Sequence, residues 1–146
     1  METMKKQVEA REKSALAEAL DAVGDRWTLL VVEALLDGAR RFNDLQAQVP
    51  GIAANILAQR LRHLEEGALV VADPYSERPP RYVYELTAAG RELAGTLRLL
   101  ADWGARHSGA EGVRHEACGT PLEVRWYCPT CERAVEEGGE DELHFA

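Results

Sequence analysis

Residues 43–66, NDLQAQVPGIAANILAQRLRHLEE, decide the fold that the sequence predicts. The pattern indicates two short amphipathic helices joined by a sharp turn at Pro50 and Gly51. Asn43 is expected to cap the first helix, because its side-chain oxygen can accept a hydrogen bond from an N–H of the first turn. Proline disfavours helical dihedrals in the residue before it, so that helix should end at Val49.

The second helix carries two opposite stripes with the same spacing of i, i+4 and i+7. One stripe is apolar and should face the core: Leu57, Leu61 and Leu64. The other is polar: Asn55, Gln59 and Arg62. Asn and Gln can make paired hydrogen bonds to adenine, and Arg to guanine, so this stripe suits the reading of base edges in a major groove. An ordinary solvated helix face has the same pattern, and the helix alone leaves both interpretations open.

A predicted β-hairpin follows this helix. Residues 69–74 and 81–86 have strand-forming patterns, and residues 75–80, YSERPP, favour a turn between them. Arg78 and Arg81 flank the tip. Two helices joined by a turn and followed by a hairpin are typical of the winged helix-turn-helix arrangement. In that arrangement the second helix enters the major groove and the hairpin lies along the flanking backbone.

Length and composition favour one domain with a small appendage, since the chain has 146 residues of which 46% are hydrophobic. No apolar run approaches the roughly 18 residues of a membrane span. The N-terminal segment has no apolar region typical of a signal peptide, so we expect a cytoplasmic protein. The three cysteines are odd in number and all lie near the C-terminus, which argues against a disulfide framework.

The net charge of −8 is unfavourable for binding nucleic acid, but it is unevenly distributed. Residues 36–107 hold nine basic and nine acidic residues, whereas residues 108–146 hold three basic and nine acidic residues. Phosphate contact depends on the field within a Debye length of about 10 Å. The balanced region keeps a basic edge: Arg40, Arg41, Arg60, Arg62, His63, Arg78 and Arg81. We expect modest non-specific affinity and a shallow salt dependence.

The N-terminal part predicts a polar lead-in over residues 1–13, then a helix from Ser14 with Leu16, Leu20 and Val23 on one face. Gly24 and Asp25 interrupt the pattern. Residues 27–36, WTLLVVEALL, are apolar nearly all round, which predicts a central core helix. Arg41 and Phe42 could form a small third strand beside the hairpin.

A long helix is predicted from an N-cap at Thr87 to about Arg106. Its apolar residues exceed what one face of a small domain needs: Leu93, Leu97, Leu99, Leu100, Ala101 and Trp103. An exposed stripe of this size favours a contact between two copies of the chain. Alternatively, the first helix of the same chain covers it.

The C-terminal part contains the pattern H-x2-C-x9-C-x2-C after a linker at residues 108–113. His115, Cys118, Cys128 and Cys131 are spaced as two ligand pairs of a closed structural zinc site. Residues 122–127 could run back as a strand and bring the pairs together. A metal-free hairpin and a redox pair at Cys128 and Cys131 are the alternatives. The acidic residues 132–146 predict disorder.

Several segments, in order, resemble the HxlR-type winged-helix transcriptional regulators of bacteria over about residues 19–104. They are Gly24-Asp25-Arg26-Trp27-Thr28-Leu29-Leu30, Arg41-Phe42-Asn43-Asp44-Leu45, Pro50-Gly51-Ile52, Leu57, Arg60-Leu61-Arg62, Leu64-Glu65-Glu66, Pro79-Pro80-Arg81, Tyr84, Leu86-Thr87 and Gly90. The resemblance implies a homodimer built from the terminal helices that binds operator DNA as a repressor or an activator.

Two positions depart from that family pattern. Ala53 stands where the family commonly carries Ser or Thr as the cap of the second helix. Ser14 lies where many members have a cysteine, through which some of them sense electrophiles or oxidants, so a redox response would have to use Cys118, Cys128 and Cys131.

We therefore expect a mainly α fold with a small antiparallel β-hairpin, divided into a winged helix-turn-helix domain (14–107), a zinc-ribbon-like appendage (113–134) and an acidic tail (135–146). The predicted function is sequence-specific DNA binding by a homodimer on a palindromic operator. Base contacts are expected from Asn55, Gln59 and Arg62, and phosphate or minor-groove contacts from Asn43, Arg60, His63, Arg78 and Arg81.

A winged-helix adaptor that binds proteins through the zinc ribbon and the acidic tail is the alternative function. An enzyme is disfavoured, because the sequence has no paired carboxylates, no Gly-rich phosphate loop and no Ser/His/Asp set.

Overall fold

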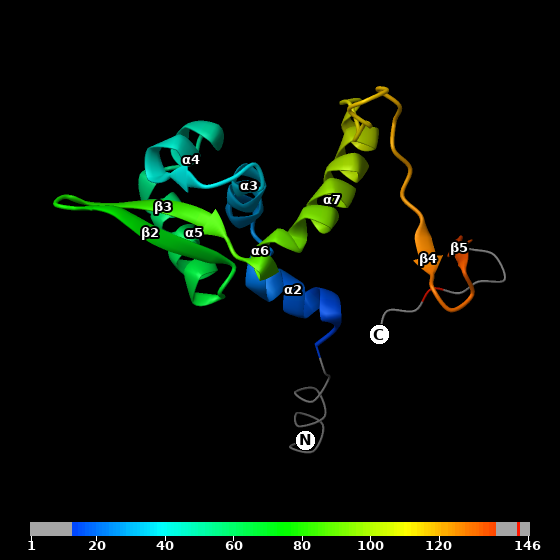
Figure 1. Ribbon diagram of the computed structural model, residues 1–146, viewed down its shortest axis with the longest axis horizontal. Coiled ribbons are helices and arrows are strands. Elements are labelled where there is room, and N and C mark those ends of the chain that lie inside the picture. The colour runs from blue at the N-terminus through cyan, green and yellow to red at the C-terminus, as the bar shows by residue number, and fades with distance from the viewer. Residues whose placement is uncertain (1–12, 137–142, 144–146) are drawn as a thin grey trace, which may run out of the picture.

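The computed structural model describes residues 13–136 and residue 143 (Figure 1). Its elements are α2 (Ala15–Val23), α3 (Arg26–Leu35), β1 (Arg40–Arg41), α4 (Phe42–Gln48), α5 (Ala54–Glu66), β2 (Val70–Glu77), β3 (Pro80–Leu86), α6 (Ala88–Arg91), α7 (Leu93–Ser108), β4 (Trp126–Cys128) and β5 (Arg133–Val135). This order confirms the predicted helix-turn-helix followed by a β-hairpin. The predicted lead-in and most of the predicted acidic tail lie outside the described residues.

The hydrophobic core is built around α3, as its apolar sequence predicts. Val31, Val32 and Leu35 of α3 are buried, together with Thr28. Residues from α4, α5 and the hairpin surround them: Leu45, Val49, Ile52, Leu57, Leu61, Leu64, Val70 and Leu86. Each fully buried leucine contributes about 1.5–3 kcal/mol. This core holds the helix-turn-helix and the hairpin in one rigid unit.

The first helix of the helix-turn-helix begins earlier than the sequence predicts. Arg41, and not Asn43, is the N-cap of α4. The Asp44 carboxylate accepts a hydrogen bond from the Arg41 backbone N–H at 3.4 Å, and Asn43 lies exposed in the first turn. The prediction failed because β1 already brings Arg41 to the helix start. The turn to α5 is as expected, since Gly51 has a φ of +83° that favours glycine.

The hairpin is longer than predicted. The three strands have the order β1-β3-β2 and are antiparallel. Residues 75–80 were predicted as a turn, but β2 continues to Glu77 and β3 begins at Pro80, so the tip is only Arg78 and Pro79. A register shift between Pro74 and Ser76 lets Tyr75 bulge from the ladder. The small strand predicted at Arg41 and Phe42 exists as β1, one residue earlier.

The long helix predicted from Thr87 is in fact two helices, α6 and α7, which meet at Glu92. Thr87 is the N-cap of α6, as predicted, and its Oγ1 accepts from the Gly90 N–H at 3.1 Å. Gly90 packs against the Leu69 backbone so closely that a Cβ would lie 2.2 Å from the Leu69 carbonyl oxygen. After this docked turn, α7 runs away from the hairpin (Figure 1).

The C-terminal extension, residues 109–136, contains little regular structure. A bridge pairs Arg114 with Pro121, and β4 pairs with β5 as a short antiparallel hairpin. The strand predicted over residues 122–127 was mostly wrong, because only Trp126 and Tyr127 of that range are in β4. Arg133–Val135 was part of the segment predicted to be disordered, but it forms the strand β5. In Figure 1 this hairpin lies apart from the core.

Candidate nucleic-acid interface

Helix α5 presents a polar face to solvent while leucines fix it from beneath. Leu57, Leu61 and Leu64 are at most 1% exposed. The opposite face is exposed along its whole length: Asn55, Gln59 and Arg62. The structure therefore brings together, on one open helix face, the three side chains that the sequence assigns to base contacts.

The wing, defined here as the β2–β3 hairpin, projects from the core at the side of α5 (Figure 1). Arg78 at its tip and Arg81 at the start of β3 are both exposed. Arginine is one of the side-chain types that contact the phosphate backbone in protein–DNA complexes.

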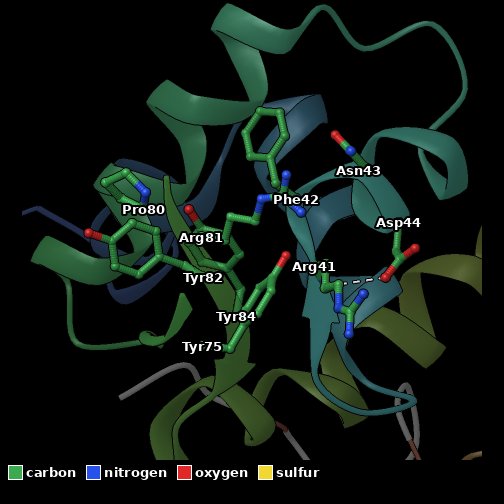
Figure 2. Close-up of a pocket in the computed structure, with 9 residues that line it drawn as sticks. All are labelled: Arg41, Phe42, Asn43, Asp44, Tyr75, Pro80, Arg81, Tyr82 and Tyr84. Atoms are coloured by element: carbon green, nitrogen blue, oxygen red, sulfur yellow. Dashed lines mark hydrogen bonds between the residues drawn. The ribbon is translucent and has the colours of Figure 1, made fainter. Parts of the chain in front are cut away.

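A groove of about 500 Å³ separates the first turn of α4 from the wing (Figure 2). Its lining combines cations, an amide and aromatic rings: Arg41, Phe42, Asn43, Asp44, Tyr75, Pro80, Arg81, Tyr82 and Tyr84. The Arg41 guanidinium lies 4.9 Å from the centre of the Tyr75 ring. Burial raises the pKa of Tyr84, with further contributions from Glu65 and Tyr82.

Two of the predicted phosphate-binding residues already have partners at α2 and at the start of α3. Arg60 Nε lies 3.2 Å from Asp25 Oδ1, and His63 Nε2 lies 2.8 Å from the Ala22 carbonyl oxygen. These contacts tie α5 to the junction of α2 and α3. Burial raises the pKa of Asp25, but hydrogen bonds from Thr28 and Trp27 and the charge of Arg60 outweigh it, so the pKa is lowered overall.

The sequence reasoning missed part of this surface. Tyr75 and Tyr82 were not singled out, and Arg41 was only part of a basic edge. The alternating pattern of residues 81–86 predicted the strand that carries Arg81, Tyr82 and Tyr84. The bulge that brings Tyr75 to Arg41 could not be predicted from the sequence.

The predicted metal ligands form two separate pairs. His115 Nδ1 lies 3.2 Å from Cys118 Sγ, whereas Cys128 ends β4 and Cys131 lies in the turn that follows it. Within residues 13–136, no group of three or more His, Cys, Asp or Glu side chains is close enough to share a metal ion. Hydrogen bonds from Thr120 and from His115 lower the pKa of the Cys118 thiol, and hydrogen bonds from the Cys131 and Thr130 backbone lower that of Cys128.

Apolar side chains remain exposed on both terminal helices. Leu16 and Leu20 of α2 are 66% and 54% exposed, and Leu100 and Trp103 of α7 are 50% and 54% exposed. Leu93 and Leu97 of the predicted stripe instead pack against the core. The stripe is therefore divided, and α2 does not cover its exposed half. Among the described residues, no helix is long and apolar enough to span a membrane.

An anchored helix with an open polar face beside an arginine-tipped wing defines a winged helix-turn-helix protein of the DNA-binding class. The family profile described as HxlR-like helix-turn-helix matches residues 22–111, and the chain belongs to this family. It is thus a regulator and not an enzyme.

Relatives agree with this assignment. The uncharacterised HTH-type transcriptional regulator Rv3095 of Mycobacterium tuberculosis is 38% identical over 129 residues, which cover 85% of this chain and 81% of that protein. A match of that extent must continue beyond residue 111 into the C-terminal extension. The Bacillus subtilis regulator YtcD is 35% identical over 88 residues, covering 60% of this chain and 70% of that protein.

Solved structures share the fold. The crystal structure of the putative regulator YtcD has a TM-score of 0.62 at 33% identity and covers 66% of this chain and 99% of that one. The redox regulator HypR in its reduced form has a TM-score of 0.60 at 31% identity and covers 64% of this chain and 93% of that one.

Proposed function

We propose that this protein is a sequence-specific transcriptional regulator that acts in the cytoplasm as a homodimer on a palindromic operator. The observation that carries the proposal is the open face of α5, where Asn55, Gln59 and Arg62 are exposed above buried leucines. Side chains of these types can make paired hydrogen bonds to adenine and guanine in the major groove.

The wing and the groove beside it supply the phosphate contacts in this proposal. Arg78 and Arg81 lie at the wing tip, and Asn43 and Arg41 line the groove with Arg81. Arg60 and His63 serve mainly to fix α5 against α2 and α3, because both already have partners there. To contact phosphate as predicted, Arg60 and His63 would have to bind it while keeping, or after releasing, Asp25 and the Ala22 carbonyl oxygen.

The dimer in this proposal forms through the exposed apolar faces of α2 and α7. Four large apolar side chains, Leu16, Leu20, Leu100 and Trp103, are at least half exposed on these two helices. Two copies joined there would present two α5 helices, and helices about 34 Å apart can read the two halves of a palindrome.

The first test is selection of bound fragments from genomic DNA, followed by gel shifts with the enriched site. Gln59→Ala should reduce discrimination between that site and random duplex by about 1–3 kcal/mol, because one paired base contact is lost. Gln48→Ala is the matched control, since Gln48 lies exposed at the end of α4 beside α3. Equal discrimination by Gln59→Ala and wild type would contradict the reading role of α5.

A protein-binding adaptor is the second candidate, favoured by the exposed Leu122, Val124, Trp126 and Tyr127 of the extension. Binding to random duplex at low salt separates the two functions, because an adaptor has no reason to bind phosphate.

A further inference from the structure

The C-terminal extension holds two tight turns that each carry a pair of metal-binding side chains. His115 and Cys118 lie in the turn between the bridge partners Arg114 and Pro121. Cys128 is the last residue of β4, and Cys131 lies in the turn between β4 and β5. We propose that these two turns are the halves of one structural zinc site, with three sulfur ligands and one nitrogen ligand.

The two turns have the same backbone conformation directly after the second ligand of each pair. The residue directly after the second ligand has a left-handed conformation in both, with a φ of +70° at Gly119 and +53° at Glu132. A positive φ is unfavourable for a residue such as Glu132, which indicates that the turn geometry is strongly determined. This shared bend lets the two side chains of each pair point to the same side.

The sulfur atoms also have hydrogen-bonding partners. Cys118 Sγ donates a hydrogen bond to Thr120 Oγ1 at 3.2 Å, and the Thr120 backbone is a further hydrogen-bonding partner of this thiol. Cys128 Sγ accepts hydrogen bonds from the backbone N–H groups of Thr130 and Cys131. Outer hydrogen bonds of this kind orient thiolate ligands and offset their charge. Arg133, the register partner of Cys128, adds a cation beside a site whose total charge would be −1.

The extension has little else to stabilise it. Its strands β4 and β5 have three residues each, and a two-stranded hairpin is at best marginally stable in water. Its large apolar side chains Leu122, Val124, Trp126 and Tyr127 are all exposed, and no disulfide joins the three cysteines, all of which are described. Small domains of this kind depend on a metal for their folding free energy.

The two pairs do not share a site in the structure, so zinc would have to draw the two turns together. Nine residues separate Cys118 from Cys128. A segment of that length can extend to about 30 Å or fold back on itself, so the connection does not prevent the approach. A tetrahedral S₃N site has no open position, which assigns the ion a structural role.

The test is metal analysis of the full chain purified without chelator. We expect about one zinc per chain, with X-ray absorption fitting three sulfur atoms near 2.3 Å and one nitrogen near 2.0 Å. Replacement of zinc by Co²⁺ should give the intense absorption of tetrahedral cobalt thiolates. Absence of zinc together with no cobalt spectrum would overturn the proposal.

Variants of each half decide whether the site is joint. The pair His115→Ala with Cys118→Ser should lose the metal as completely as the pair Cys128→Ser with Cys131→Ser, whereas retention by either variant would overturn a joint site. His115→Cys should keep the metal, because a fourth thiolate replaces the imidazole. His107→Ala is the control outside the motif. Removal of the metal by a chelator should leave the oligomeric state unchanged in sedimentation. Dissociation into smaller species would instead place the ion between copies of the chain.

Discussion

At the residue scale, Asp25 connects the start of α3 to α5. It is the N-cap of α3, where its Oδ1 accepts hydrogen bonds from the Trp27 and Thr28 N–H groups at 3.0 and 3.1 Å. The same carboxylate contacts the Thr28 hydroxyl and the Arg60 guanidinium on α5. These donors favour the ionised form, so the charge on Asp25 couples the start of the core helix to the helix that is proposed to read DNA.

Asp25→Asn should therefore lower the free energy of unfolding in a pH-dependent way. Asn can still cap α3, but it loses the charge that attracts Arg60. Because the folded state lowers the pKa of Asp25 below its ordinary value of 3.8, its stabilising effect is present above that pH and is lost as the pH falls through the folded-state value. Urea unfolding at a series of pH values should show the difference from wild type shrinking below about pH 4. Asp37→Asn is the control for the change in net charge. If the difference in the free energy of unfolding between Asp25→Asn and wild type stays constant down to pH 2, the ionised Asp25 does not stabilise the contact with Arg60.

Ala53 is the N-cap of α5 and offers no side-chain hydrogen bond to the first turn. Its φ of −74° and ψ of 147° already suit a capping residue. Ala53→Ser should raise the free energy of unfolding by about 1 kcal/mol, because the hydroxyl can accept an orphan N–H. Ala54→Ser, one residue inside the helix, should give no such gain. Equal denaturation midpoints for the two variants would show that the cap is not what limits α5.

Predictions for single residues succeeded where a side chain caps the helix that directly follows it. Thr87 begins its helix as expected. Asn43 does not, because β1 pairs Arg41 with Val83 and so fixes the start of the helix two residues earlier. Tyr75 reached the groove only through a bulge, and a bulge depends on how two strands register with each other.

At the element scale, a change in the wing should affect affinity for all DNA sequences, whereas a change in α5 should affect discrimination between sequences. Arg81→Ala should weaken binding to all duplexes about equally and reduce the slope of log affinity against log salt by about 1, since one phosphate contact is removed. Competition gel shifts at several salt concentrations measure both effects. Arg98→Ala removes one exposed cation from α7, away from the wing, and should leave the slope unchanged. An unchanged slope for Arg81→Ala would exclude the wing from the contact surface.

The elements themselves were largely predictable, and their ends were not. The apolar spacing of Leu57, Leu61 and Leu64 was enough to define the buried face of α5. The break between α6 and α7 was not visible, because Glu92 is a good helix former. That break follows from the docking of Gly90 against the Leu69 carbonyl, which is a tertiary contact.

At the scale of the whole molecule, the acidic charge and the exposed apolar surface both lie mainly outside α5 and the wing. The acidic excess lies in residues 108–146, so the wing and α5 keep their local arginines although the net charge is −8. The open apolar faces lie on α2 and α7, which extend away from the wing (Figure 1). Sequence patterning predicted the uneven charge and the apolar stripe of α7, but it could not separate Leu93 and Leu97, which pack against the core, from Leu100 and Trp103, which do not.

That separation makes Trp103 the residue with which to test the proposed dimer. Its side chain is 54% exposed, and its ring lies 4.4 Å from that of His107. Trp103→Glu should yield a monomer in sedimentation and should reduce affinity for a full palindrome by about 10²–10⁴-fold, because the second half-site is no longer bound intramolecularly. Affinity for an isolated half-site should not change, since α5 is untouched. Leu122→Glu, at a comparably exposed position of the extension, should remain dimeric. A Trp103→Glu protein with the mass of wild type would move the dimer contact to another surface.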